Sequence, residues 1–90
     1  MVQYEIKITG RVQGVGFRYF VQQRAAEFNI KGWVKNERDG SVLVRAQGEE
    51  KDVETFLEHL RIGPSMARVL KVEKSKIPEL EDFTDFIITN

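Results

Sequence analysis

The sequence predicts a single α+β domain in which two helices pack on one face of an antiparallel sheet, in the order β-α-β-β-α-β with a further strand at the end. Three observations predict it. Apolar and polar residues alternate near the N-terminus, apolar residues recur at helical spacing in two later segments, and the tight-turn dipeptide Asp39-Gly40 separates two segments rich in strand formers. The 90 residues carry no internal repeat or linker, so we expect one domain over residues 1–90.

The first strand is expected over residues 2–9, and a glycine-rich loop follows over residues 10–16. In the strand, one set of alternate positions is apolar, as on a strand with one buried face: Val2, Tyr4, Ile6 and Ile8. After the loop, apolar residues recur at helical spacing and leave the intervening polar residues for solvent: Phe17, Phe20, Val21, Ala25 and Phe28. Asn29 and Gly32 indicate where this helix ends.

The next two strands are expected over residues 31–37 and 41–47, joined by the Asp39-Gly40 turn. A second helix follows, because apolar residues stand at i, i+3, i+4 and i+7: Val53, Phe56, Leu57 and Leu60. Acidic residues begin this helix, where they suit the helix dipole, and Gly63-Pro64 ends it. Residues 66–74 and 83–89 are expected to be strands, with a turn at Pro78.

This order is the split β-α-β arrangement of ferredoxin-like folds. Right-handed crossovers place both helices on one face of the sheet. We therefore expect the strands in the order fourth, first, third, second, with the last strand at the edge beside the second. The architecture hosts many unrelated activities, so function has to be argued from the site.

Composition excludes several classes of function. Lysine plus arginine equals aspartate plus glutamate, whereas nucleic-acid-binding domains usually carry a basic excess. The absence of cysteine excludes disulfides, zinc–thiolate sites and thiol catalysis. Apolar runs fall far short of the roughly 20 residues that span a bilayer, and no signal peptide is evident. We expect a cytoplasmic protein, monomeric by default, with no membrane or nucleic-acid partner.

The loop from Gln13 to Arg18, with sequence Gln-Gly-Val-Gly-Phe-Arg, is a candidate phosphate site. Two glycines let the backbone curl, and N–H groups that precede a helix N-terminus converge where an anion is favoured. Arg18 is off the apolar stripe of the helix, and a guanidinium can grip two phosphate oxygens. A dinucleotide-binding loop would need glycine at Tyr19, and the nucleotide P-loop sequence is absent. The pattern alone is equally that of a structural turn beside a solvated arginine.

Two segments together resemble the signatures of the acylphosphatase family. Residues 10–18 are similar to its pattern Gly-x-Val-x-Gly-Val-x-Phe-Arg, and Gly32-Trp33-Val34-Lys35-Asn36 resembles its second signature. The resemblance covers essentially the whole chain and implies hydrolysis of acyl phosphates without metal or other cofactor. It implies that Arg18 binds the phosphate, that Asn36 positions water, and that backbone forms the phosphate cradle at Gln13, Gly14, Val15, Gly16 and Phe17.

These residues suit the reaction, because an acyl phosphate has a weakly basic leaving group that needs little protonation. The enzyme must stabilise charge on the phosphoryl oxygens as water attacks in line, which N–H groups and Arg18 can do. The Asn36 amide cannot act as a base near neutral pH, but it can hold and aim a water. No base accompanies these residues, so we infer that the substrate phosphate accepts the water's proton.

Other residues receive structural interpretations, and other functions remain open as alternatives. His59 lies off its helix stripe and is expected to face solvent, Trp33 and Phe20 are expected in the core, and Arg11 is left outside the catalytic set. An RNA-binding module of the same topology would carry stacking aromatics on the third strand, where residues 41–47 have none. A non-catalytic small-ligand module is the other alternative, and a third is an acylphosphatase-like domain of a larger maturation protein that handles carbamoyl phosphate. The sequence does not indicate which side chains would contact the acyl group.

Overall fold

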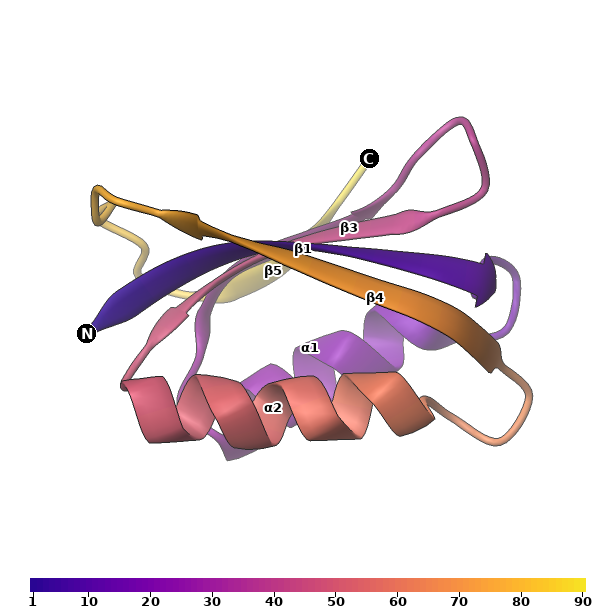
Figure 1. The fold of residues 1–90 in the computed structure, drawn as a ribbon, viewed down its shortest axis with the longest axis horizontal. Coiled ribbons are helices and arrows are strands. Elements are labelled where there is room, and N and C mark those ends of the chain that lie inside the picture. The colour runs from indigo at the N-terminus through magenta and orange to yellow at the C-terminus, as the bar shows by residue number, and fades with distance from the viewer.

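A five-stranded sheet forms one layer of the molecule, and two helices cover one of its faces (Figure 1). The computed structural model describes all 90 residues. The strands lie in the order β4-β1-β3-β2-β5, which confirms the expected order. The elements along the chain are β1 (Val2–Arg11), α1 (Phe17–Glu27), β2 (Lys31–Asn36), β3 (Val42–Gly48), α2 (Glu50–Ile62), β4 (Arg68–Ile77) and β5 (Phe86–Thr89).

The sheet is mixed, so the expectation of an antiparallel sheet was wrong at one edge. The pairs β1–β3, β1–β4 and β2–β3 are antiparallel, but β2 and β5 are parallel. The reason is that β4 ends opposite the start of β1, with Ile77 paired to Gln3. A strand that sets out from that end must run in the direction of β1 and β2.

The first strand continues two residues beyond its expected end. Gly10 and Arg11 still pair with β4, after an irregularity in register between Thr9 and Gly10. Gly10 has a φ of 133°, and a Cβ at this position would collide with the backbone oxygen of Arg68. The expected loop over residues 10–16 is therefore shorter, and Val12 is the first residue after β1.

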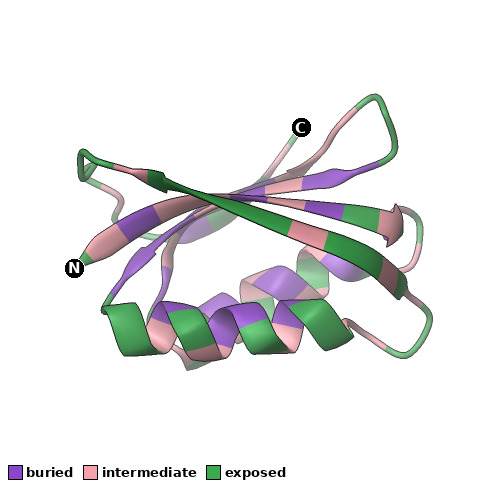
Figure 2. Ribbon diagram, viewed as in Figure 1, coloured by how far each residue is buried: buried purple, intermediate pink, exposed green.

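The core lies between the helices and the sheet, as the buried segments in Figure 2 show. Both predicted helix stripes face it. Phe17, Val21 and Ala25 are buried, while Phe20 and Phe28 are partly buried against the same cluster. All four stripe residues of α2 are buried: Val53, Phe56, Leu57 and Leu60. His59 is partly buried rather than fully in solvent, because its ring packs 5.0 Å from that of Phe28.

Trp33 does not belong to this core, contrary to expectation. Successive side chains of a strand point to opposite faces, and the neighbouring Val34 is the one that is fully buried beneath the helices. Trp33 thus lies on the open face of the sheet, opposite Arg45 in register. Lys35 and Arg45 place their cationic groups 5.5 Å and 5.7 Å from its ring centroid.

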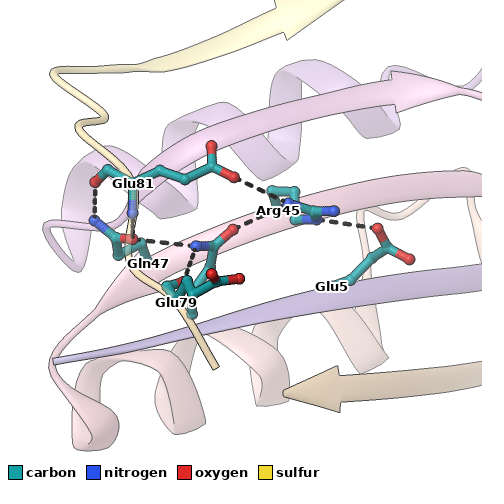
Figure 3. Close-up of polar contacts among 6 residues, drawn as sticks. Glu5, Arg45, Gln47, Glu79 and Glu81 are labelled. Carbon is teal, nitrogen blue, oxygen red and sulfur yellow. Dashed lines mark hydrogen bonds and ion pairs between the residues drawn. The ribbon is translucent and has the colours of Figure 1, made fainter. Parts of the chain in front are cut away.

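The open face carries a polar network around two buried glutamines, under the segment that joins β4 to β5, residues 78–85 (Figure 3). Gln3, on β1, is fully buried there; its amide nitrogen donates to the backbone oxygen of Glu79 at 2.8 Å. The amide of Gln47, on β3, donates to the backbone oxygen of Glu81 and accepts from its N–H, at 2.8 and 2.9 Å. Arg45 bridges Gln3 and the carboxylates of Glu5 and Glu81. The network fastens residues 78–85 across the sheet.

Neither helix is long and apolar enough to cross a membrane.

Candidate active site

A cavity of about 200 Å³ lies where four segments meet: the end of β1, the start of α1, the end of β2 and β5. In Figure 1 this is the end of the sheet at which the arrow of β1 leads through a loop into α1. The cavity is lined by Val12, Gly14, Gly16, Phe17, Arg18, Tyr19, Asn36 and Ile88. Both motifs singled out in the sequence thus contribute to one cavity.

The loop before α1 depends on the backbone freedom of two glycines. Gly14 and Gly16 have φ angles of 74° and 76°, in the left-handed region that other residues rarely adopt. A Cβ at either position would meet no atom within 4 Å, so glycine is required for conformation rather than for space. Gly16 is also the N-cap of α1, directly before its first helical residue, Phe17.

The start of α1 leaves backbone donors free at the cavity. The N–H groups of residues 13–16 lie outside every helix and strand, and none of them donates to a backbone carbonyl. The first N–H groups of a helix have no partner within the helix, and no side chain caps α1. Its first turn contains no acidic residue. These free donors and the positive end of the helix dipole favour an anion.

Arg18 is placed in the first turn of α1, half-buried, at the edge of the cavity. It takes part in none of the ion pairs of the structure. Its guanidinium therefore has donors that no carboxylate of the protein occupies. This adds a positive charge to a site that already presents N–H groups.

Asn36, the last residue of β2, lies across the cavity on the helix-facing side of the sheet. Its side-chain oxygen Oδ1 is buried and accepts no hydrogen bond from any group of the protein. Leaving a buried acceptor unsatisfied costs about 1–3 kcal/mol, so such atoms are uncommon in folded proteins. Asn36 therefore carries an acceptor that the protein does not satisfy, and it lines the same cavity as the loop glycines and Arg18.

The side chain of Gln13 points away from the cavity and holds the loop in place. Its amide nitrogen donates to the backbone oxygens of Glu37 and Ser41, at 2.8 and 2.9 Å. Those two residues flank the β2–β3 turn, so this contact fixes the distance between the loop and the end of β2, which carries Asn36. The side chain of Gln13 therefore supports the loop, and Gln13 does not line the cavity.

The β2–β3 turn is itself ordered by Asp39. Its carboxylate accepts hydrogen bonds from the N–H and hydroxyl of Ser41, at 3.0 and 2.6 Å, and lies 2.9 Å from Lys7 Nζ. The hydrogen bonds from Ser41, together with Lys7, hold the pKa of Asp39 well below its usual range. Asp39 stabilises the turn from outside the cavity.

Most of the sequence-predicted site residues come together, with two exceptions. Gly14, Gly16, Phe17, Arg18 and Asn36 line the cavity, whereas Gln13 and Val15 do not. Val15 is partly buried against the core. No three His, Asp or Glu side chains lie close enough together to hold a metal ion, and the metal independence of the reaction stays a prediction.

Sequence reasoning missed Val12, Tyr19 and Ile88, which line the cavity as well. A signal for Tyr19 was present, because it is an aromatic residue off the apolar stripe of its helix. Ile88 had none, because it reaches the cavity only through the pairing of β5 with β2, in which it lies opposite Val34.

Comparison with known proteins assigns the family. The family model described as Acylphosphatase matches residues 4–88. An acylphosphatase of Oceanobacillus iheyensis is 49% identical over 87 residues, 96% of each chain. One of Archaeoglobus fulgidus is 46% identical over 86 residues, again 96% of each.

Solved structures agree with this. The crystal structure of acylphosphatase from Bacillus subtilis superposes over 100% of both chains with a TM-score of 0.97 and 41% identity. Full-length HypF, in its phosphate- and nucleotide-bound form, matches 99% of this chain at 33% identity and a TM-score of 0.88, but only 12% of its own length is covered. The two sequence motifs, the fold and these full-length similarities agree: the chain belongs to the acylphosphatase family.

Proposed function

We propose that the protein hydrolyses acyl phosphates to a carboxylate and inorganic phosphate, with Arg18 and the backbone of residues 13–17 binding the phosphate and Asn36 positioning the water. The observation that carries this is one cavity whose lining combines free donors with an acceptor that no group of the protein satisfies. The donors are the loop N–H groups and an unpaired Arg18; the acceptor is Oδ1 of Asn36.

The donor side suits a phosphoryl group. Its charge is spread over several oxygens, and preorganised N–H groups stabilise that charge without rearranging during the reaction. A guanidinium adds two parallel donors and remains charged at any working pH. The absence of an acidic residue from the first turn of α1 means that no carboxylate of this turn competes for these donors.

The acceptor side suits the attacking water. An amide oxygen can accept a hydrogen bond from one water proton and so direct the water's lone pair toward phosphorus. The amide does not take the proton, and no carboxylate or imidazole lines the cavity. In this proposal the proton goes to an oxygen of the substrate phosphate as the bond from water oxygen to phosphorus forms and the phosphorus–carboxylate bond breaks.

The same features limit the leaving group. A carboxylate leaves without being protonated, whereas an alkoxide requires a general acid, and the cavity lining contains no carboxyl, imidazole or ammonium group to act as one. We infer a small-molecule acyl phosphate as the partner, no cofactor, no nucleic-acid partner and a monomeric cytoplasmic enzyme. The zero net charge and the absence of aromatic residues from β3 support the lack of nucleic-acid binding.

The test is a hydrolysis assay with benzoyl phosphate, with and without a metal chelator. We expect turnover that the chelator leaves unchanged, competitive inhibition by inorganic phosphate, and little action on an alkyl phosphate. Comparable turnover of the alkyl phosphate would contradict the proposed leaving-group requirement. Activity lost in chelator and restored by added metal would contradict metal independence.

A further inference from the structure

The cavity has an apolar wall that the binding of a phosphate does not explain. Val12 and Phe17 are each 1% exposed and form its buried base, but Tyr19 and Ile88 are 61% and 39% exposed. Neither of these two side chains belongs to the hydrophobic core or packs against it. The fold thus holds two large apolar side chains at the rim of the site without using them for its own packing.

Tyr19 is fixed in orientation although it is exposed. It stands one turn before Gln23 on α1, and the Gln23 amide nitrogen donates to its hydroxyl oxygen at 2.8 Å. A side chain anchored at its tip presents a face of defined direction and loses little conformational entropy when a ligand packs on it. Ile88 lies on β5, so the two residues of the apolar wall come from different elements.

The charges at the cavity indicate which part of a substrate this wall contacts. Arg18 is the only charged residue of the lining, and it lies on the phosphate-binding side. A second charged group of a substrate would find no partner at Tyr19 or Ile88. An uncharged flat group attached to the phosphate would instead cover an aromatic ring and a branched aliphatic chain, the kind of contact that aromatic groups favour.

We propose that Tyr19 and Ile88 form the acyl-group subsite and determine a preference for acyl phosphates with uncharged, aromatic acyl groups. The inference rests on the proposed hydrolysis of acyl phosphates and adds the residues that select among them. Ile87 is the matched control, because it is the adjacent residue on β5, is 53% exposed, and lies on the opposite face of the strand, outside this cavity.

The experiment compares kcat/KM for benzoyl and acetyl phosphate in the wild type and in Tyr19→Ala, Ile88→Ala, Tyr19→Phe and Ile87→Ala. Contacts of an aromatic ring are worth about 3- to 10-fold in affinity, so each Ala variant at the subsite should lower the benzoyl-to-acetyl ratio by about this factor. Tyr19→Phe, which keeps the ring, and Ile87→Ala should keep the ratio. Inhibition by inorganic phosphate should change less than about 2-fold, because the donors of the loop remain.

Two results would overturn the subsite. One is an unchanged ratio in both Tyr19→Ala and Ile88→Ala; the other is an equal fall in Ile87→Ala. A fall in Tyr19→Phe as large as in Tyr19→Ala would assign the effect to the hydroxyl and contradict an apolar contact.

Binding of benzoylphosphonate and acetylphosphonate, measured by calorimetry, separates the subsite from the proposed function. Their carbon–phosphorus bond is not broken by this hydrolysis, so they test binding alone. If the wild type hydrolyses neither acyl phosphate, yet prefers benzoylphosphonate in a Tyr19-dependent manner, the hydrolytic proposal fails and the subsite stands. If it hydrolyses both and no variant changes the preference, the subsite fails alone.

Discussion

Replacing Asn36 by alanine should separate stability from catalysis, because no group of the protein hydrogen-bonds to its side-chain oxygen. Its Oδ1 is buried without a hydrogen-bond partner from the protein. A buried, unsatisfied acceptor costs about 1–3 kcal/mol of folding free energy. Asparagine and alanine are both poor strand formers, so the substitution changes the preference of β2 for its conformation little. We expect the free energy of unfolding of Asn36→Ala to stay within about 1 kcal/mol of the wild type, because the water that Oδ1 holds in the proposal offsets most of that cost.

The rate of hydrolysis should fall steeply in the same variant. If Asn36 directs the attacking water, its loss removes one preorganised hydrogen bond at the reaction centre, a change that typically costs about 10²–10³ in turnover. The affinity for inorganic phosphate should remain near that of the wild type, since Arg18 and the loop are intact. A contact made only on the way to the transition state lowers turnover without changing ground-state binding.

Three measurements on the same variant decide the matter: urea denaturation, calorimetric binding of phosphate, and single-turnover hydrolysis of benzoyl phosphate. Lys35→Ala is the control, because Lys35 is the preceding residue of β2, lies on the open face and lines no part of the cavity. A fall of phosphate affinity in step with turnover would make Asn36 a phosphate ligand and refute the division of labour. A loss of stability above about 1 kcal/mol would refute the argument from the unsatisfied oxygen.

Three further changes test other parts of the structure. Arg18→Ala should lower kcat/KM for benzoyl phosphate at least about 10²-fold. Arg18→Lys should recover little of this loss, because an ammonium group cannot bind two phosphate oxygens in the bidentate manner of a guanidinium. A near-normal rate in either variant contradicts the assigned role of Arg18. Gly32→Ala should lower the free energy of unfolding, measured by urea denaturation, by about 3 kcal/mol. The reason is that Gly32 has a φ of 143° and that a Cβ there would collide with the backbone oxygen of Arg45. A loss under about 0.5 kcal/mol would show that β2 and β3 can move apart to accommodate the methyl group. The pKa of Asp39 is lowered on folding, so its contribution is present above the unfolded pKa of about 4 and is lost as pH falls further. Urea denaturation from pH 6 down to pH 3 should therefore show a weaker decline of stability in Asp39→Asn than in the wild type, and parallel declines would refute the assignment.

The elements of the fold could be predicted because periodicity reports directly which face of each element is buried. Helix α2 is the clearest case, since the four apolar residues of its predicted stripe are all buried. The direction of β5 could not be predicted in this way, because the sequence of a four-residue strand does not indicate which strand it pairs with or whether the pairing is parallel. Its orientation follows from where β4 ends, at Ile77, which is three residues past the expected end of the strand over residues 66–74.

Which residues of the open face are buried also could not be predicted from the sequence. Gln3 occupies a polar position in the alternating pattern of β1, which indicates solvent, yet it is fully buried. What buries it is a segment 76 residues later in the chain, whose Glu79 carbonyl accepts its hydrogen bond. Trp33 shows the reverse, because its apolar character indicated the core. Side chains alternate along β2 and Val34 faces the helices, so Trp33 lies with Arg45 on the open face.

The candidate site was predictable to the extent that it is local in sequence. Gly14, Gly16 and Arg18 lie in one loop and helix start, and Asn36 lies in the second motif; all four reach the cavity. The backbone of Gln13 was assigned to the cradle as well, which stays a prediction, and its side chain holds the β2–β3 turn. The apolar wall was not predictable, because Ile88 is brought to the cavity only by long-range strand pairing.

The parallel pairing of β5 thus connects the two ends of the molecule. Because β2 and β5 run in the same direction, both strands finish at the end of the sheet that carries the cavity, and Ile88 can stand beside the strand of Asn36. An antiparallel β5 at the same edge would carry its last residues to the opposite end and leave the cavity without this wall. The direction of β5 depends in turn on the return of the chain over residues 78–85, which the buried amides of Gln3 and Gln47 fasten to the far end of the sheet. Polar residues that the sequence assigned to solvent therefore support an apolar surface at the other end of the domain.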